Sequence, residues 1–339
     1  MRKMTSRSFA LIVMLVLSMI LVACSSSDSD NDTTQENRKK ILTYGHSGSA
    51  SSLDPAHMKE GDSFVVIANM YETLVNLGEQ DTTVVPGLAE KWESTDDGLT
   101  YTFKLRQDVK FHDETDFNAD AVVSNFERWS NGNAEDFFYY GLVFDGFKKD
   151  GGSVIKSVKA DGDDTVIIEL NYPQESFLKN LTMNPFSMVS PTSLEQAEID
   201  TENIPVGTGP FKFGEGKLNE TITLVKFEGY WQEELPKLNK IVFKSIPNNI
   251  ARLNALIAKD IDLADSINPA DRLEIANDED LQFFERPFVE NIYENVSSIP
   301  NVNSLPLLGA TKELLGFVPR LTGFDVLSKV QFELQLEED

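Results

Sequence analysis

The residues of this chain best suited to chemistry are the serines of a small-residue loop near its start. Gly45-His46-Ser47-Gly48-Ser49 comes close to the G-x-S-x-G nucleophile elbow, in which a serine at a sharp strand-to-helix turn attacks a carbonyl carbon. The fifth position is serine instead of glycine, and no helical pattern follows directly. An extracytoplasmic serine hydrolase acting through Ser47 is therefore kept only as an alternative, and we predict that the chain is not an enzyme.

The three histidines, His46, His57 and His112, could in principle bind a metal ion. They lack the short spacing and the companion acids of known zinc motifs, so no metal site is predicted. The chain has no Walker A motif and no G-x-G-x-x-G. Gly207-x-Gly209 stands alone and is followed by Pro210, which could not lie inside a helix opened by a phosphate loop. We predict no cofactor.

The only cysteine, Cys24, follows a basic start and an apolar run over residues 9–22. That run is shorter than a membrane-spanning helix needs and ends in a small residue, as secretory signals do. Leu21-Val22-Ala23-Cys24 resembles a bacterial lipobox. We therefore expect a lipoprotein signal peptide over residues 1–23, lipidation of Cys24 and a flexible tether over residues 24–39. This places the chain on the cell membrane, lipid-anchored at its extracytoplasmic face.

The charge balance limits the partners of the chain. Its 339 residues include 55 acidic and 30 basic ones, giving a formal net charge of −25. Such a surface repels phosphate backbones, which excludes nucleic acid as a partner. It also argues against docking on anionic lipid through charge. The length favours two domains, and 41% hydrophobic residues are typical of a globular protein.

The clearest structural pattern lies between residues 86 and 129. Asp97-Gly98 predicts a hairpin turn, and apolar residues then alternate with polar ones over residues 99–106, as in a strand with one buried face. Asn118 is a predicted N-cap, and Val122, Phe126 and Trp129 share one face of the helix that follows. We expect both Trp92 and Trp129 to pack in a core.

Similar patterns predict the other elements. We expect a strand over residues 40–44, a helix over 64–77, a hairpin over 154–170, a short capped helix near 193–196, strands over 206–213, 221–227 and 240–246, a helix over 249–259 and a strand-loop-helix unit after it. Strands mixed with helices in this way indicate an α/β fold.

These residues together resemble the family 5 extracellular solute-binding proteins. The resemblance is carried by LAEKWESTDDGLTYTFKLRQDVKFHD, by FNADAVVSNFER and by VGTGPF, in that order. Members are the peptide-binding components of ABC importers. The resemblance implies a class II periplasmic-binding-protein-like fold, in which a mixed-sheet lobe carries an inserted, smaller α/β subdomain.

The resemblance also sets the expected domains. Residues 40–77 and 191–287 would form the first lobe, and residues 78–190 the inserted subdomain. In the family a second lobe follows residue 287. Here a short junction over 288–300 leads at once to residues 301–339, which are similar to the family's closing segment and would return to the first lobe. The second lobe is therefore expected to be largely absent.

The resemblance implies where a ligand would touch the first lobe. It indicates the loop with Ser47, Ser49, Ala50 and Ser51, and an aromatic residue of residues 137–140, here Tyr139 and Tyr140. The aspartate and arginine that clamp a dipeptide in the family lie in the second lobe. Peptide binding is thus expected to be weak or lost.

The resemblance also implies ABC importer permease subunits as partners, and we expect a monomer. The family includes binders of dipeptides, oligopeptides, nickel, glutathione and oligosaccharides, and the sequence does not select among them. A second alternative is a non-transporting lipoprotein remnant that acts through interactions with other proteins.

Overall fold

The computed structural model describes residues 40–48, 50, 52–58, 61–79, 81–199, 206–285, 307–320 and 325–332. Residues 41–339 form one unit, and every element below belongs to it. Cys24, the predicted signal peptide, the tether and the junction lie outside the described residues.

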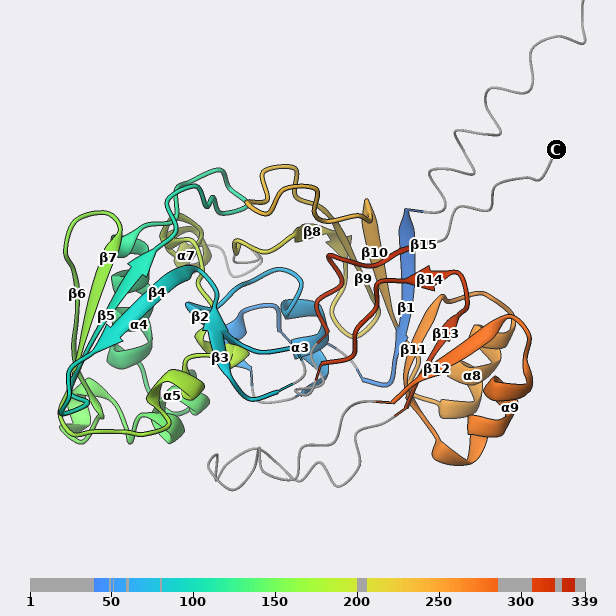
Figure 1. The fold of residues 1–339 in the computed structure, drawn as a ribbon, viewed down its shortest axis with the longest axis horizontal. Coiled ribbons are helices and arrows are strands. Elements are labelled where there is room, and N and C mark those ends of the chain that lie inside the picture. The colour runs from blue at the N-terminus through green and yellow to red at the C-terminus, as the bar shows by residue number, and fades with distance from the viewer. Residues whose placement is uncertain are drawn as a thin grey trace, which may run out of the picture. The chain divides into compact units, whose positions relative to one another are not determined.

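The larger sheet of this unit is mixed (Figure 1). Its strands, in spatial order, are β12 (Leu281–Phe284), β13 (Leu307–Thr311), β11 (Leu263–Ile267), β1 (Ile41–His46), β10 (Lys240–Ser245), β9 (Thr221–Lys226) and β8 (Phe211–Gly216). β1 is parallel to both β10 and β11, and the remaining neighbours are antiparallel. The predicted α/β class with a mixed sheet is confirmed.

The smaller sheet has four antiparallel strands and is packed against a helix. Its order is β4 (Ala89–Ser94), β5 (Thr100–Leu105), β7 (Thr165–Leu170) and β6 (Ile155–Ala160), and α4 (Ala119–Asn131) covers it. Gly98 takes φ +66° at the β4–β5 turn, and the Asn118 side chain accepts the Ala121 N–H at 2.9 Å. The predicted turn and N-cap are both confirmed.

Shorter elements complete the unit. The helices are α3 (Gly61–Ile67), α5 (Phe138–Val143), α6 (Phe177–Asn180), α7 (Pro191–Ile199), α8 (Asn249–Ile257) and α9 (Arg272–Asn277). The 3-10 turns are η1 (Pro55–His57), η2 (Lys148–Asp150), η3 (Asn184–Phe186) and η4 (Pro269–Asp271). The two-stranded pairs are β2 (Val75–Leu77) with β3 (Val84–Pro86) and β14 (Leu314–Leu315) with β15 (Gln331–Phe332).

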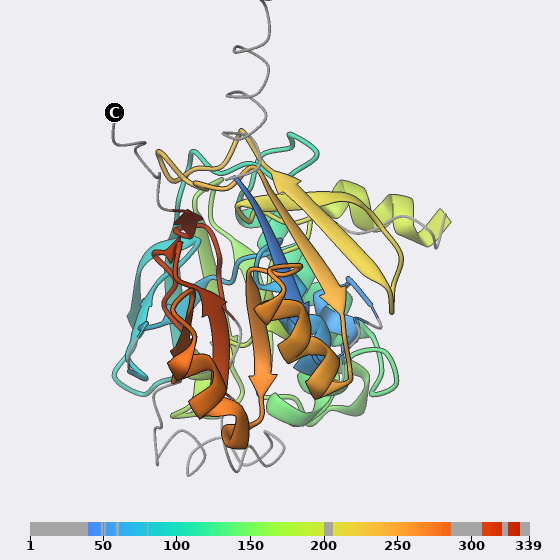
Figure 2. The ribbon, with the colours of Figure 1, turned by 90° about the vertical axis from the view of Figure 1, so that its right-hand side faces the viewer.

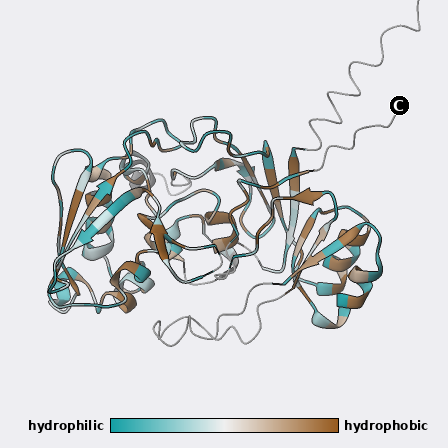
Figure 3. Ribbon diagram, in the orientation of Figure 1, coloured by the Kyte–Doolittle hydropathy of each residue, from teal (hydrophilic) through white to brown (hydrophobic). Residues whose placement is uncertain are grey.

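Alternation along the strands divides the apolar residues between two cores. Ile241 and Phe243 of β10 are fully buried in the larger core, which continues into the four-stranded sheet and includes Trp129 at 1% exposure. The smaller core lies between α8, α9 and the opposite face of β11. Hydrophobic residues lie mainly on strands and helices, and the loops are mainly hydrophilic (Figure 3). Among the described residues, no helix has both the length and the apolar character to cross a bilayer.

The helix predicted over residues 64–77 is wrong in its second half. α3 ends at Ile67, and β2 begins at Val75. After the helix, the backbone carbonyls of Asn69 and Met70 accept the N–H groups of Phe211 (3.1 Å) and Gly209 (3.0 Å). The fully buried Asn69 side chain also bonds across the fold, donating to the carbonyl of Asp325 at 3.1 Å and accepting the Leu327 N–H at 2.8 Å. The long-range backbone bonds take the place of the helical bonds that a longer helix would make.

Candidate functional site

The carboxyl ends of the parallel strands β1, β10 and β11 meet at one edge of the larger sheet. In open α/β sheets, ligands bind outside this edge. Five polar residues gather there, and together they are called the strand-end site: Ser47, Ser245, Arg252, Asp265 and Ser266.

Ser47 follows β1 directly and connects it to β11. Its backbone N–H donates to Oδ1 of Asp265 at 2.9 Å, and its hydroxyl donates to Oγ of Ser266 at 3.0 Å. Ser245, at the end of β10, donates from Oγ to the carbonyl of Gly48 at 2.8 Å. The loop after β1 is thus fixed by side chains from both neighbouring strands, as a binding surface on a rigid scaffold requires.

Arg252 of α8 bonds to the backbone of β11 and of the residue that follows β10. Its side chain is 2% exposed, and it donates to the backbone carbonyls of Ile246 (2.6 Å), Asp265 (2.8 Å) and Ser266 (2.7 Å). Nε also lies 3.9 Å from Oδ1 of Asp265, so the buried charge has a carboxylate nearby. A guanidinium can satisfy several carbonyls at once because its donors form a rigid planar fork.

Ser266 adopts an unusual backbone conformation within β11. Its φ of +50° lies in the left-handed region, which disfavours side chains other than glycine, asparagine and aspartate. The pairing of β11 with β13 shifts register between Ala264 and Ile267, at the same place. Such strain, about 1–3 kcal/mol, persists where surrounding contacts fix it and is typical of ligand sites.

The structure describes part of the predicted binding loop. Ser47 belongs to the strand-end site, whereas Ala50 is 2% exposed and packs in the larger core. Ser49 and Ser51 lie outside the described residues. The ligand roles of all four residues stay predictions.

Tyr139 and Tyr140 lie on α5 and pack with other aromatic rings. Tyr139 is 7% exposed, with its ring 6.2 Å from that of Phe64. Tyr140 is 2% exposed and lies 5.2 Å from the ring of Phe144; burial raises its pKa to about 12. These described contacts belong to the core, and a ligand contact by either tyrosine also stays a prediction.

The strand-end site has no arrangement for nucleophilic catalysis by Ser47. Its hydroxyl donates to another serine, and a serine cannot take up the proton as a histidine base does. His112 is likewise engaged, with Nε2 2.9 Å from the carbonyl of Gly209. Burial lowers the pKa of His112 to about 4. Within the described ranges, no group of His, Cys, Asp or Glu is arranged to hold a metal ion.

A second polar cluster surrounds the buried carboxylate of Glu72. The carboxylate accepts hydrogen bonds from Thr208 Oγ1 (2.9 Å), Tyr230 OH (3.0 Å) and Trp231 Nε1 (3.0 Å). The guanidinium of Arg106, which follows β5 of the smaller sheet, lies 4.3 Å above the ring of Trp231. Burial raises the pKa of Glu72 to about 7, although the three hydrogen bonds oppose the shift. We interpret this cluster as a structural contact that connects the segments following the two sheets, rather than as a binding site.

The sequence indicated Ser47 but not its partners. Asp265 and Ser266 interrupt the apolar run of residues 263–267, and this pair of polar residues inside an apolar strand is the signal that could have found them. Arg252 gave no signal of its own, because it lies within an ordinary amphipathic helix pattern.

Comparison with known proteins supports the predicted family. Residues 83–303 match the family described as bacterial extracellular solute-binding proteins, family 5 Middle. The dipeptide-binding protein of Escherichia coli (strain K12) is 32% identical over 263 residues, which cover 73% of this chain and 49% of that protein. Heme-binding protein A of Haemophilus influenzae is 32% identical over 287 residues, which cover 79% of this chain and 52% of that protein.

The fold is similar to that of solved structures as well. The ABC transporter-associated periplasmic binding protein DppA from Helicobacter pylori, in complex with the peptide STSA, matches with a TM-score of 0.65 and 30% identity. That match covers 74% of this chain and 52% of the other. The chain therefore spans about half the length of the curated relatives it matches.

Proposed function

Because the chain belongs to the family 5 bacterial extracellular solute-binding proteins, we propose that it is a substrate-binding lipoprotein of an ABC importer with peptides as its ligand class. Members of this family are solute-binding proteins and not enzymes. The proposed partners are the importer's permease subunits, and the proposed place is the extracytoplasmic face of the membrane, with Cys24 as the lipid anchor.

The observation that carries the proposal is the strand-end site. Its serine hydroxyls and the Asp265 carboxylate lie where open α/β sheets bind ligands, next to a residue held in a strained conformation. An extended peptide would lie along this edge and bond to the loop after β1. Ser47, Ser49, Ala50 and Ser51 are the proposed contacts, with Tyr139 and Tyr140 as the proposed aromatic contribution.

We propose that peptide affinity is much reduced in this chain. The resemblance places the charged groups that clamp a dipeptide in the second lobe, and each lost charge-assisted contact is worth about 1.5–3 kcal/mol. A loss of about 4 kcal/mol converts a micromolar dissociation constant into a millimolar one.

A dipeptide titration tests this proposal. We expect no micromolar affinity by calorimetry, but saturable NMR shifts of the Ser47 and Asp265 amides at dipeptide concentrations of about a millimolar. Ser47→Ala should abolish these shifts, and Ser124→Ala, a solvent-facing change on α4, should leave them unchanged. The E. coli dipeptide-binding protein serves as the positive control.

Other outcomes of this titration favour other functions. A micromolar dissociation constant for any dipeptide would contradict the reduced affinity. If saturable shifts are absent at all concentrations, the chain is better described as a non-transporting lipoprotein that acts through protein partners. Labelling of Ser47 by a fluorophosphonate probe would instead support the hydrolase alternative.

The lipid anchor has its own test. Cells expressing the full chain should incorporate labelled palmitate into it, and Cys24→Ala should abolish the label and release the chain from the membrane fraction. Ser26→Ala, a neighbouring change that leaves the thiol intact, is the matched control. Retention of the Cys24→Ala chain on membranes would refute anchoring through this residue.

A further inference from the structure

One face of the larger sheet has a helix over only part of its width. α8 packs on β11 and β13 and reaches β1 at Gly45, and α9 packs on β12, whereas no described helix has comparable contact with β10, β9 and β8. Figure 2 shows β9 and β10 beside α8 with no helix in front of them. This part of the sheet presents side chains to solvent.

The residues on this face follow from the strand register. Ile241 and Phe243 point into the larger core, so Lys240, Val242 and Lys244 point the other way. Val225 pairs with Lys240 on one side and with Lys212 on the other, and Thr43 pairs with Val242, so all of them share that direction. These six partly exposed residues are called the basic sheet face: Thr43, Lys212, Val225, Lys240, Val242 and Lys244.

The lysines of this face are not paired with carboxylates. Many lysines elsewhere do form ion pairs, as Lys104 does with Asp164, Lys217 with Glu220 and Lys259 with Asp280. Lys212, Lys240 and Lys244 form no ion pair with any described residue, although the chain has a net charge of −25. Lys244 instead donates from Nζ to the backbone carbonyl of Asp260 at 3.4 Å, and Nζ of Lys212 lies 5.8 Å from the ring centroid of Phe227.

Acidic residues also lie at this face. Asp262 is turned inward, and its carboxylate accepts the Thr43 N–H at 2.7 Å. Glu215 pairs with Thr223 at the β8 edge. Salt screens charges over about 8–10 Å at physiological ionic strength, so the distant acids that dominate the net charge act weakly here. Within the described part of this face, the three lysines are the cations that an anionic surface would meet.

The chain enters the described fold beside this face. Ile41 begins β1 and pairs with Lys240, and Cys24, the proposed lipid anchor, lies upstream of it. An extended chain advances at most about 3.3–3.6 Å per residue, so an anchored lobe stays within a few tens of ångströms of the bilayer. We propose that the basic sheet face docks on anionic phospholipid headgroups and orients the anchored lobe on the membrane.

The lipid anchor in this inference rests on the proposed function, whereas the basic sheet face is defined from the structure independently of it. A juxtamembrane lysine adds about 1 kcal/mol of attraction to an anionic surface, or about fivefold in partitioning. Three lysines together should give a gain on the order of 100-fold at low salt, which high salt removes.

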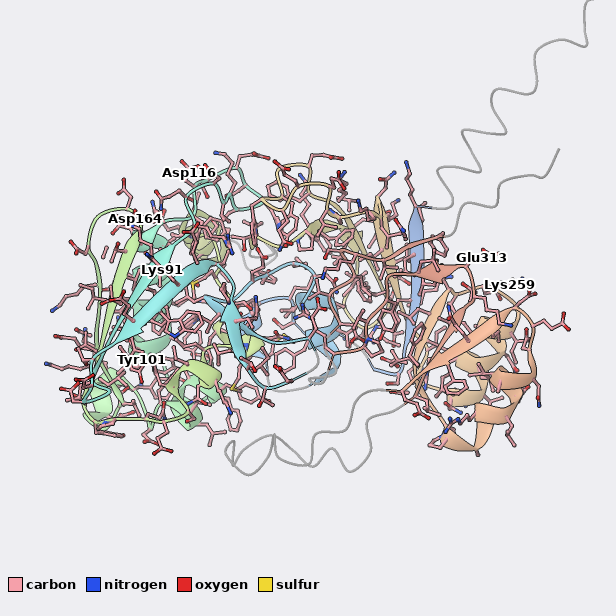
Figure 4. All side chains as sticks on the ribbon, viewed as in Figure 1. Lys91, Tyr101, Asp116, Asp164, Lys259 and Glu313 are labelled. Atoms are coloured by element: carbon pink, nitrogen blue, oxygen red, sulfur yellow. The ribbon has the colours of Figure 1, made fainter. Side chains whose placement is uncertain are left out.

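Lysine acetylation footprinting of the full chain on protein-free vesicles tests the proposal. On vesicles containing phosphatidylglycerol, acetylation of Lys212, Lys240 and Lys244 should fall about fivefold relative to phosphatidylcholine vesicles, and high salt should restore it. Lys91, an exposed lysine on β4 of the smaller sheet (Figure 4), and Lys148 are internal controls whose acetylation should not change.

Two variants separate the face from the anchor. The Cys24→Ala chain lacks the lipid, so its salt-dependent sedimentation with phosphatidylglycerol vesicles reports the face alone. The triple variant Lys212→Gln, Lys240→Gln, Lys244→Gln should lose that sedimentation and still incorporate palmitate. Equal acetylation on both vesicle types would overturn the proposal. Protection on native membranes but not on protein-free vesicles would overturn it too, and would indicate a protein partner instead.

Discussion

Replacing Arg252 with methionine should lower the free energy of unfolding by about 3–5 kcal/mol, the cost of breaking a buried charge pair by removing one partner. The change removes the donors to three backbone carbonyls and the positive charge that lies 3.9 Å from the Asp265 carboxylate. Methionine fills a similar apolar volume, so the decrease in the free energy of unfolding reflects the lost hydrogen bonds more than a new cavity. Urea unfolding followed by circular dichroism measures it.

Lys259→Met is the matched control for this prediction. Lys259 follows α8 and pairs with Asp280 at 2.8 Å, but both side chains are more than half exposed. An exposed pair contributes at most about 1 kcal/mol. If both substitutions cost the same, the buried guanidinium does not hold the strand-end site together as we infer.

In the wild-type chain, ionisation of Glu72 should lower the free energy of unfolding by about 3 kcal/mol between pH 4.5 and pH 8, and Glu72→Gln should remove this pH dependence. Burial raises the pKa of Glu72 from 4.5 in its ordinary state to about 7 in the fold. Between these values the folded state holds a proton that the unfolded state has released. The contribution of Glu72 is therefore fully present below pH 4.5 and is lost as the pH rises through about 7.

The measurement compares wild type and variant at each pH. The stability of the glutamine variant relative to wild type should rise by about 3 kcal/mol between pH 4.5 and pH 8. His112 opposes this trend in both chains, since its lowered pKa of about 4 favours the fold at higher pH, and it cancels in the difference. Glu90→Gln, an exposed change on β4, is the control. Its stability relative to wild type should change by less than about 0.5 kcal/mol over the same pH range. A flat difference for Glu72→Gln would mean that its carboxylate ionises normally.

Local signals predicted the parts of the fold that local physics determines. Asp97-Gly98 and Asn118 act within a few residues of themselves, through a left-handed turn and a hydrogen bond to Ala121, so the sequence alone revealed them. The helix predicted over residues 64–77 shows the limit of this reasoning. The apolar spacing permitted a longer helix, but Asn69 bonds to residues more than 250 positions away.

The same limit applies to the candidate site. Ser47 could be predicted because it follows a recognisable strand in a small-residue loop. Its partner Ser266 is 219 residues away in the sequence, and only the parallel pairing of β1 with β11 brings the two together. Arg252 looks like any helical residue until the fold directs three carbonyls towards it.

The pairing of β12 with β13 has an evolutionary consequence. Phe284 lies opposite Leu308, so the chain leaves the sheet after β12 and returns at β13 through neighbouring positions. A connection whose ends already meet can grow or shrink at small entropic cost: a tenfold change in its length alters the closure free energy by only about 2 kcal/mol. Whole domains could be gained or deleted between these two strands over evolutionary time, while the sheet that carries them keeps its register.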